Sequence, residues 1–96
     1  MSSLAIMEKT PEDRIDYDVD FTNWLTDGDQ LVDGIANVED PATVSFTVDR
    51  VDFSTEVVKV WVVGGAIGDE GEIFAQATTQ TGRVKRACFT MRIRDC

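Results

Sequence analysis

The sequence contains no histidine, only two prolines and two cysteines, and no long apolar run. Without histidine the chain lacks the commonest general base and the usual nitrogen ligand of zinc. Nucleophile pairs of the Ser/His and Cys/His kinds are therefore excluded. The apolar run at residues 4–7 is too short for a membrane span or for the core of a signal peptide. We therefore expect a soluble protein that is not exported.

The two cysteines, Cys88 and Cys96, lie eight positions apart, and Cys96 is the last residue. Small secreted domains that depend on disulfides usually carry more pairs, and a chain end holds a disulfide poorly. We therefore expect no structural disulfide between them.

Acidic residues outnumber basic residues by 18 to 9, which gives a net charge of −9. This charge repels nucleic acid phosphates, so direct nucleic acid binding is not expected. Residues 1–72 carry 17 acidic and 4 basic residues, a net −13, whereas residues 73–96 carry 1 acidic and 5 basic residues, a net +4. The last segment is therefore a basic stripe on an acidic body, formed by Arg83, Lys85, Arg86, Arg92 and Arg94.

From residue 14 onward, apolar and polar residues alternate with a period of two, which predicts β-strands. The expected strands cover residues 15–21, 30–38, 44–53 with a bulge before residue 51, 57–63, 72–79 and 84–94. This pattern predicts a single all-β domain over residues 14–96, an immunoglobulin-like antiparallel β-sandwich of six or seven strands. The aromatic residues expected to hold the sandwich together are Trp24, Trp61, Phe46, Phe74 and Phe89.

Residues 1–13 show no sustained period, and we interpret them as an extended N-terminal arm. Two interpretations of this arm stay open. It is either a disordered terminus or a segment that docks Leu4, Ile6 and Met7 onto a neighbouring subunit.

The acidic residues suggest cation sites that their spacing does not support. Asp16, Asp18 and Asp20 share one face of a predicted strand, but a flat strand splays carboxylates that calcium needs to converge. The turn-rich segment 27–34 lacks the spacing of an EF-hand loop, although it contains Asp27, Asp29 and Asp33. The glycine-rich loop that follows residue 63 fits no phosphate-binding fingerprint. We predict no catalytic residue, no metal site and no cofactor.

The basic stripe has two interpretations. It is either the outer face of an edge strand, where charge prevents pairing with foreign strands, or a docking surface for an acidic partner. The acidic body of the chain itself offers such a partner surface. Copies arranged head to tail in a ring would set an acidic flank against a basic strand at every contact.

Three segments carry a resemblance to a known family: "DYDVDFTNWL", "VKVWVVGGAIGDEGEIF" and "TTQTGR". In this order they resemble the fiber-tail adaptors, small virion proteins of tailed phages, over most of residues 16–94. The positions that match the family pattern are Asp20, Phe21, Trp24 and Leu25, then Trp61, Gly64, Gly65 and Gly68, and finally Thr78, Thr79, Gly82 and Arg83.

This resemblance implies an immunoglobulin-like virion protein without catalytic residues, present in many copies around the tail axis. It implies contacts with portal-proximal, nozzle or fiber proteins. We therefore expect a structural adaptor at the head-tail connector or neck, linking tail or connector proteins to fibers and assembled in the host bacterial cytoplasm. The alternatives are a capsid decoration protein and a calcium- or carbohydrate-binding module in which Trp24 or Trp61 stacks on a sugar.

Overall fold

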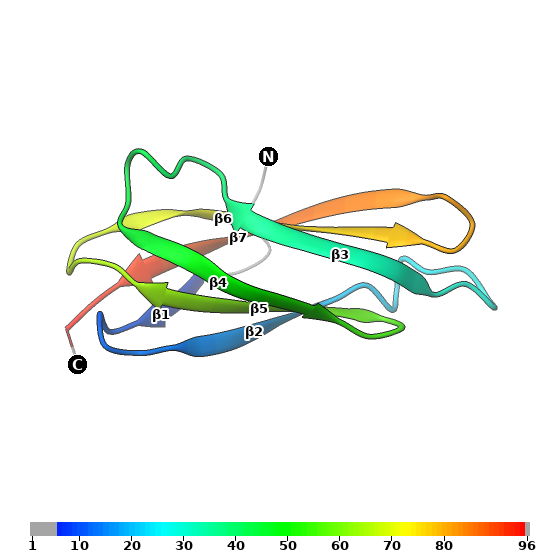
Figure 1. Ribbon diagram of the computed structural model, residues 1–96, viewed down its shortest axis with the longest axis horizontal. Coiled ribbons are helices and arrows are strands. Elements are labelled where there is room, and N and C mark those ends of the chain that lie inside the picture. Colours follow the sequence, from blue (N-terminus) through cyan, green and yellow to red (C-terminus); the bar gives the residue numbers. More distant parts are fainter. Residues whose placement is uncertain (1–5, 96) are drawn as a thin grey trace.

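The computed structural model describes residues 6–95, which form seven strands in two layers (Figure 1). None of these residues forms a helix able to span a membrane. The strands are β1 (Ile6–Lys9), β2 (Ile15–Asp20), β3 (Leu31–Val38), β4 (Phe46–Phe53), β5 (Val57–Gly64), β6 (Glu70–Thr79) and β7 (Val84–Ile93).

The strands form two sheets, one in the order β1-β7-β6-β3 and the other in the order β2-β5-β4. All neighbours are antiparallel except β1 and β7, which run parallel. The predicted all-β sandwich is thereby confirmed. In the constant-type immunoglobulin sandwich the first strand lies in the sheet of the second strand, whereas here β1 joins β7 in the opposite sheet. The closer assignment as immunoglobulin-like stays a prediction.

The core lies between the two sheets and follows the period-two pattern of the central strands. From β5, Val58, Val60 and Val62 are completely buried, and Ile73 of β6 is buried opposite them. Such a side chain contributes about 1.5–3 kcal/mol when it is removed from water. The remaining large buried side chains come from the ends of the core and from β7: Phe21, Leu31, Phe46, Phe89, Met91 and Ile93.

Two of the aromatic residues predicted for the core lie outside it. Trp61 alternates with the buried valines of β5, and Phe74 alternates with Ile73 and Ala75 of β6. Both rings are half-buried on the outer faces of their sheets, because the residues before and after them fill the interior. The core prediction is therefore wrong for these two residues, although it is right for Phe46 and Phe89.

For the six strands predicted from the sequence, each end agrees with the structure to within two residues. The bulge expected in the segment 44–53 is confirmed by a register shift between Val48 and Arg50 in the pairing of β4 with β5. A second shift, between Leu31 and Asp33, interrupts the pairing of β3 with β6. After each shift, the side chains of the bulged strand face the opposite side of the sheet from the one that strict alternation would give them.

The structure differs from the sequence analysis at the predicted arm. Ile6–Lys9 form β1, which pairs with Thr90–Ile93 of β7. Met7 packs against the core, whereas Ile6 is exposed. Leu4, the third apolar residue of the predicted docking segment, lies outside the described residues.

The molecule is elongated, with extents of 43 × 23 × 19 Å. At one end, the loop of residues 21–30 lies between the β4–β5 turn and the β6–β7 hairpin (Figure 1). Leu31 N donates to Thr55 O at 2.9 Å, and Gln80 N donates to Gln30 O at 2.9 Å. Trp24 packs against the core here, as predicted, and Leu25 packs beside it. We call this end of the sandwich the hairpin end.

Candidate functional site

The family-pattern residues Trp24 and Arg83 meet at the hairpin end. The Arg83 guanidinium carbon lies 4.4 Å from the centre of the Trp24 ring, and Arg83 Nη2 donates to Trp24 O at 3.4 Å. Trp24 in turn contacts Phe21 edge to face, with ring centres 6.1 Å apart. A guanidinium over an indole is an attractive cation–π contact. Two segments separated by almost sixty residues are therefore joined by residues of the first and third pattern.

Thr79 of the third pattern and the nearby Thr81 hold the β6–β7 hairpin in place. Arg83 N donates to Thr79 Oγ1 at 3.0 Å, Thr79 Oγ1 lies 3.1 Å from Thr81 Oγ1, and Thr81 Oγ1 donates to Asp29 Oδ2 at 2.9 Å. Gly82 has φ +91°, a conformation that L side chains rarely adopt. The hairpin loop covers residues 80–83, and Gly82 N donates to Thr79 O at 3.0 Å. It also engages Asp29, which is one of the carboxylates considered for a metal.

Arg86 lies over the outer face of its sheet. Its guanidinium carbon is 3.9 Å from the centre of the Phe74 ring, and Arg86 Nη1 lies 3.4 Å from Glu39 Oε1. Cys88 is buried beside Glu39, with Sγ 3.8 Å from Oε1. Burial and the neighbouring carboxylate of Glu39 raise the pKa of the Cys88 thiol, so it stays protonated near neutral pH. Cys96, the other cysteine, lies outside the described residues.

The arginines at the other end of β7 are paired with carboxylates of neighbouring strands. Arg92 Nε lies 2.7 Å from Glu70 Oε1 of β6, and Arg94 Nε contacts Glu8 Oε2 of β1. These pairs border an open hollow of about 630 Å³ that Ile67 and Gly68 also line. Its cations are already matched by acidic side chains of the same chain.

The basic stripe therefore acts largely inside the molecule. Four of its five members contact an aromatic ring or a carboxylate of this chain, and Lys85 makes no ion pair within residues 6–95. The strand that carries it is also not an edge strand throughout, because β1 covers Thr90–Ile93. The interpretation of the stripe as an edge-protecting face is wrong for this half of β7. Its role as an interface stays a prediction.

The glycines of the second pattern allow a close approach between the loop after β5 and the core. Gly65 has φ +104°, and a Cβ at this position would lie 2.7 Å from Ile93 Cγ1. Gly64, with φ +76°, approaches Ser45 O, and Gly68 has φ +96° in open space. The pattern therefore has a backbone explanation that requires no ligand.

Asp69 closes this loop, and the sequence analysis did not identify it. Its Oδ2 accepts from Ser45 N at 3.0 Å, from Ser45 Oγ at 2.8 Å and from Ala66 N at 3.1 Å. Donation from the Ser45 and Ala66 backbone lowers the pKa of the Asp69 carboxyl. An aspartate directly after a glycine in a turn is the available signal, because such side chains often bind nearby backbone amides.

We expect the thermal stability of Asp69→Asn to depend less on pH in acid than that of the wild type. A carboxyl whose folded pKa is lowered contributes stability above the pKa of an unfolded aspartate, about 3.9. The contribution is lost as pH falls through the folded pKa, so the wild type should lose stability below about pH 4. Thermal melts from pH 6 to pH 2 measure this, and Ser45→Ala should remove part of the same dependence. Identical pH profiles for the wild type and Asp69→Asn would contradict the assignment.

The acidic row on β2 is matched by a lysine on the neighbouring strand. Lys59 Nζ lies 3.0 Å from Asp16 Oδ2 and 3.5 Å from Asp18 Oδ1. The hydrogen bond between them lowers the pKa of Asp16 and raises that of Lys59. Asp20 turns instead to Thr22, whose backbone N donates to Asp20 Oδ1 at 2.8 Å. The row is therefore the polar outer face of a strand.

The carboxylates of residues 27–34 do not converge on one point. Asp29 accepts from Thr81, whereas Asp33 Oδ1 accepts from Gly34 N at 2.9 Å. Within residues 6–95 no group of three Cys, Asp or Glu side chains is arranged to hold a metal ion.

Both indoles considered as sugar platforms are covered by arginines. Arg14 lies 4.5 Å above the centre of the Trp61 ring and its Nε is 2.7 Å from Asp49 Oδ2, which holds it in place. Arg83 covers Trp24 in the same way. The covered faces are not available to stack on a sugar ring. Sequence reasoning missed Arg14 because its contact with Trp61 depends on the pairing of β2 with β5.

Lys9 is a second residue that the sequence analysis did not single out. It is only 3% exposed, beside Ile93 on the inner side of β1, and its Nζ donates to Thr10 O at 2.7 Å. Burial lowers the pKa of Lys9, and Asp13 and Glu12 oppose this effect. In the sequence, only the spacing of two residues between Met7 and Lys9 indicates that both lie on one strand face. A segment of four residues is too short for this spacing to stand out as a strand pattern.

One comparison with known proteins identifies the family. A search of curated proteins gives no match to the chain. The sequence model of the family described as podophage GP4 fiber-tail adaptor protein gp77 matches residues 9–92, which is most of the chain and includes every pattern residue named above. The chain therefore belongs to the podophage GP4 fiber-tail adaptor protein gp77 family.

Proposed function

We propose that this protein is a non-enzymatic virion adaptor at the head-tail or neck region, where it links tail or connector proteins to fibers. The observation that carries the proposal is the family match over residues 9–92. The contacts of the chain agree with a structural role. Its arginines, indoles and strand carboxylates are engaged with one another, and they stabilise the sandwich.

The partners in this proposal are other virion proteins, such as a portal-proximal protein, a nozzle or a fiber, together with further copies of the chain. Repetition around the tail axis follows from the symmetry of such assemblies. The net charge of −9 leaves many carboxylates without a cation of the same chain, so partners with basic surfaces are favoured. In the proposal the protein assembles in the host bacterial cytoplasm and remains in the mature particle.

Mass spectrometry and electron microscopy of purified virions test this role. We expect peptides of the chain in gradient-purified particles, and density for its sandwich at the tail or neck with a copy number set by tail symmetry. A chain that is absent from the particles would contradict the proposal. Density distributed over the shell would identify a capsid decoration protein instead.

A further inference from the structure

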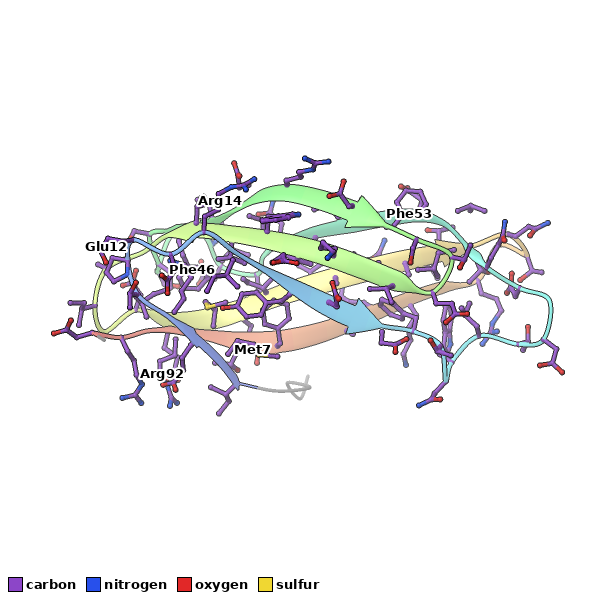
Figure 2. The ribbon with its side chains drawn as sticks, turned by 90° about the horizontal axis from the view of Figure 1, so that it is seen from below. Met7, Glu12, Arg14, Phe46, Phe53 and Arg92 are labelled. Atoms are coloured by element: carbon purple, nitrogen blue, oxygen red, sulfur yellow. The ribbon has the colours of Figure 1, made fainter. Side chains whose placement is uncertain are left out.

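The first half of β7 has a sheet edge that no strand of the described chain covers. β1 lies along the other end of β7, where it pairs with Thr90–Ile93 (Figure 2). Residues 84–87 are paired with β6 on one side, and within residues 6–95 no strand pairs with them on the other side. We call residues 84–87 the open edge of β7. Backbone groups that point into such an edge can pair with a further strand.

The hydrogen bonds at the two ends of β7 show which backbone groups point into the open edge. Thr79 N donates to Arg83 O at 2.8 Å, so the odd-numbered residues of this strand are bonded toward β6. Arg94 N donates to Lys9 O at 2.9 Å, so the even-numbered residues face the side of β1. The pairing of β6 with β7 has no register shift, and bonding directions alternate along an antiparallel strand. The N–H and C=O groups of Arg86 therefore point into the open edge.

The Arg86 side chain leaves this edge accessible. Its guanidinium carbon lies 3.9 Å from the centre of the Phe74 ring, and its Nη1 lies 3.4 Å from Glu39 Oε1. The charge is therefore held over β6, on the side away from the open edge. The free edge of the other sheet differs, because β2 carries the acidic row there. Charged side chains on an edge strand hinder the addition of a further strand.

The chain itself supplies a segment of matching length. Residues 1–5 directly precede β1, which pairs Ile6 with Thr90 in a parallel register. Continuing this register backward places residue 3 opposite Ala87 and residue 1 opposite Lys85. Lys85 pairs with the buried Ala77, so its side chain points inward, and an inward charge at an edge discourages longer strand addition. The segment therefore ends where the open edge ends.

The side-chain sizes of the segment fit the same register. Positions 3 and 5 share the strand face of Met7, which packs against the core. The Tyr17 ring of the opposite sheet lies 5.7 Å from the Phe89 ring, so this inner face has little room. Positions 3 and 5 carry a serine and an alanine, both small, whereas the larger Leu4 falls on the outer face. A register shifted by one residue would turn Leu4 inward.

We propose that residues 1–5 dock on the open edge of β7 in their own molecule and continue the parallel ladder of β1. Ser3 lies opposite Ala87. Its N–H donates to Arg86 O, and its C=O accepts from Cys88 N–H, as a regular parallel ladder requires. The segment then closes the edge against strands of other proteins, so the arm is neither a disordered terminus nor a contact with a neighbouring subunit. This inference goes beyond the proposed function and does not depend on it.

Two proline variants of the full purified chain test the docking and its register. Ser3→Pro removes the N–H that donates to Arg86 O, so the ladder opens locally. Hydrogen exchange of the Cys88 amide, followed by NMR, should become at least about tenfold faster than in the wild type. Ser2→Pro is the matched control, because the same chemical change falls where the backbone groups point away from β7. It should change this exchange rate by less than about twofold.

The Arg92 amide lies in the part of β7 that β1 covers, and its exchange rate should stay unchanged in both variants. Wild-type exchange of the Cys88 amide in both variants, or equal acceleration in both, would overturn the proposed ladder. Sedimentation velocity identifies the molecule that supplies the segment. A monomeric wild type with the Ser3→Pro effect supports docking within one molecule. A dimer that Ser3→Pro dissociates would show a segment exchanged between two copies, which overturns the proposal.

Discussion

Replacing Phe46 by alanine is expected to lower the free energy of unfolding by about 3–5 kcal/mol. Phe46 is 1% exposed and lies between the two layers near one end of the core (Figure 2). Its ring lies 3.4 Å from the position that a Cβ on Gly71 would take, and its Cβ is equally close to the corresponding position on Gly65. The neighbouring elements are close-packed here, so truncation would leave a cavity that the surroundings fill only in part. Urea unfolding followed by tryptophan fluorescence measures the change.

Phe53→Ala is the matched control, because it makes the same chemical change in the same strand. Phe53 is 46% exposed, so its replacement should lower the free energy of unfolding clearly less than the replacement of Phe46 does. The difference between the two variants then isolates burial from the identity of the side chain. Equal losses in both variants would show that the sandwich does not close around Phe46.

Gly65→Ala should be the most damaging of the glycine substitutions, with a loss of about 2–5 kcal/mol. An L side chain at the observed φ of +104° costs roughly 1–2 kcal/mol. The added methyl group would also lie 2.7 Å from Ile93 Cγ1 and 2.9 Å from Ile93 Cδ1, which forces a core side chain to move. Overpacking of this kind costs about 1–3 kcal/mol.

Gly68→Ala separates these two contributions. Gly68 also has a positive φ, +96°, but a Cβ there would meet nothing within 4 Å. This variant should therefore lose only the roughly 1–2 kcal/mol of backbone strain. The same urea titration compares both variants, and a Gly68→Ala loss as large as that of Gly65→Ala would refute the close approach to Ile93.

The alternation of residues predicted most of the fold because a half-buried strand is a local pattern. Val58, Val60 and Val62 point the same way whatever lies opposite them, so β5 was predictable from its own residues. The four residues of β1 carry too short a pattern to reveal a strand. Their pairing partner, Thr90–Ile93, lies at the other end of the chain.

The same alternation also indicated which aromatic residues face outward. Trp61 and Phe74 have the opposite strand parity to the buried residues around them, and their size led to the incorrect core assignment. The cation–π contacts of these rings were not predictable, because Arg14 and Arg86 reach Trp61 and Phe74 only when the strands are paired.

The candidate site was predictable as a set of charges but not as a set of contacts. The sequence indicated five basic residues on the last segment, whereas the structure shows that Glu8, Glu39 and Glu70 meet three of them. These carboxylates lie in β1, directly after β3 and in β6, and their positions depend on the sheet order. Lys85 makes no ion pair within residues 6–95, whereas the nearby Arg86 pairs with Glu39. The sequence around Lys85 does not indicate this difference.

The parallel pairing of β1 with β7 affects how the protein carries mechanical load. Ile6–Lys9 and Thr90–Ile93 lie side by side and point in the same direction. Opposed pulls on the two ends of the chain would slide these strands along each other, so the evenly spaced hydrogen bonds of the ladder would be stretched together. A tether attached through its ends would resist this shearing better than it would resist an unzipping of the same strands one bond at a time.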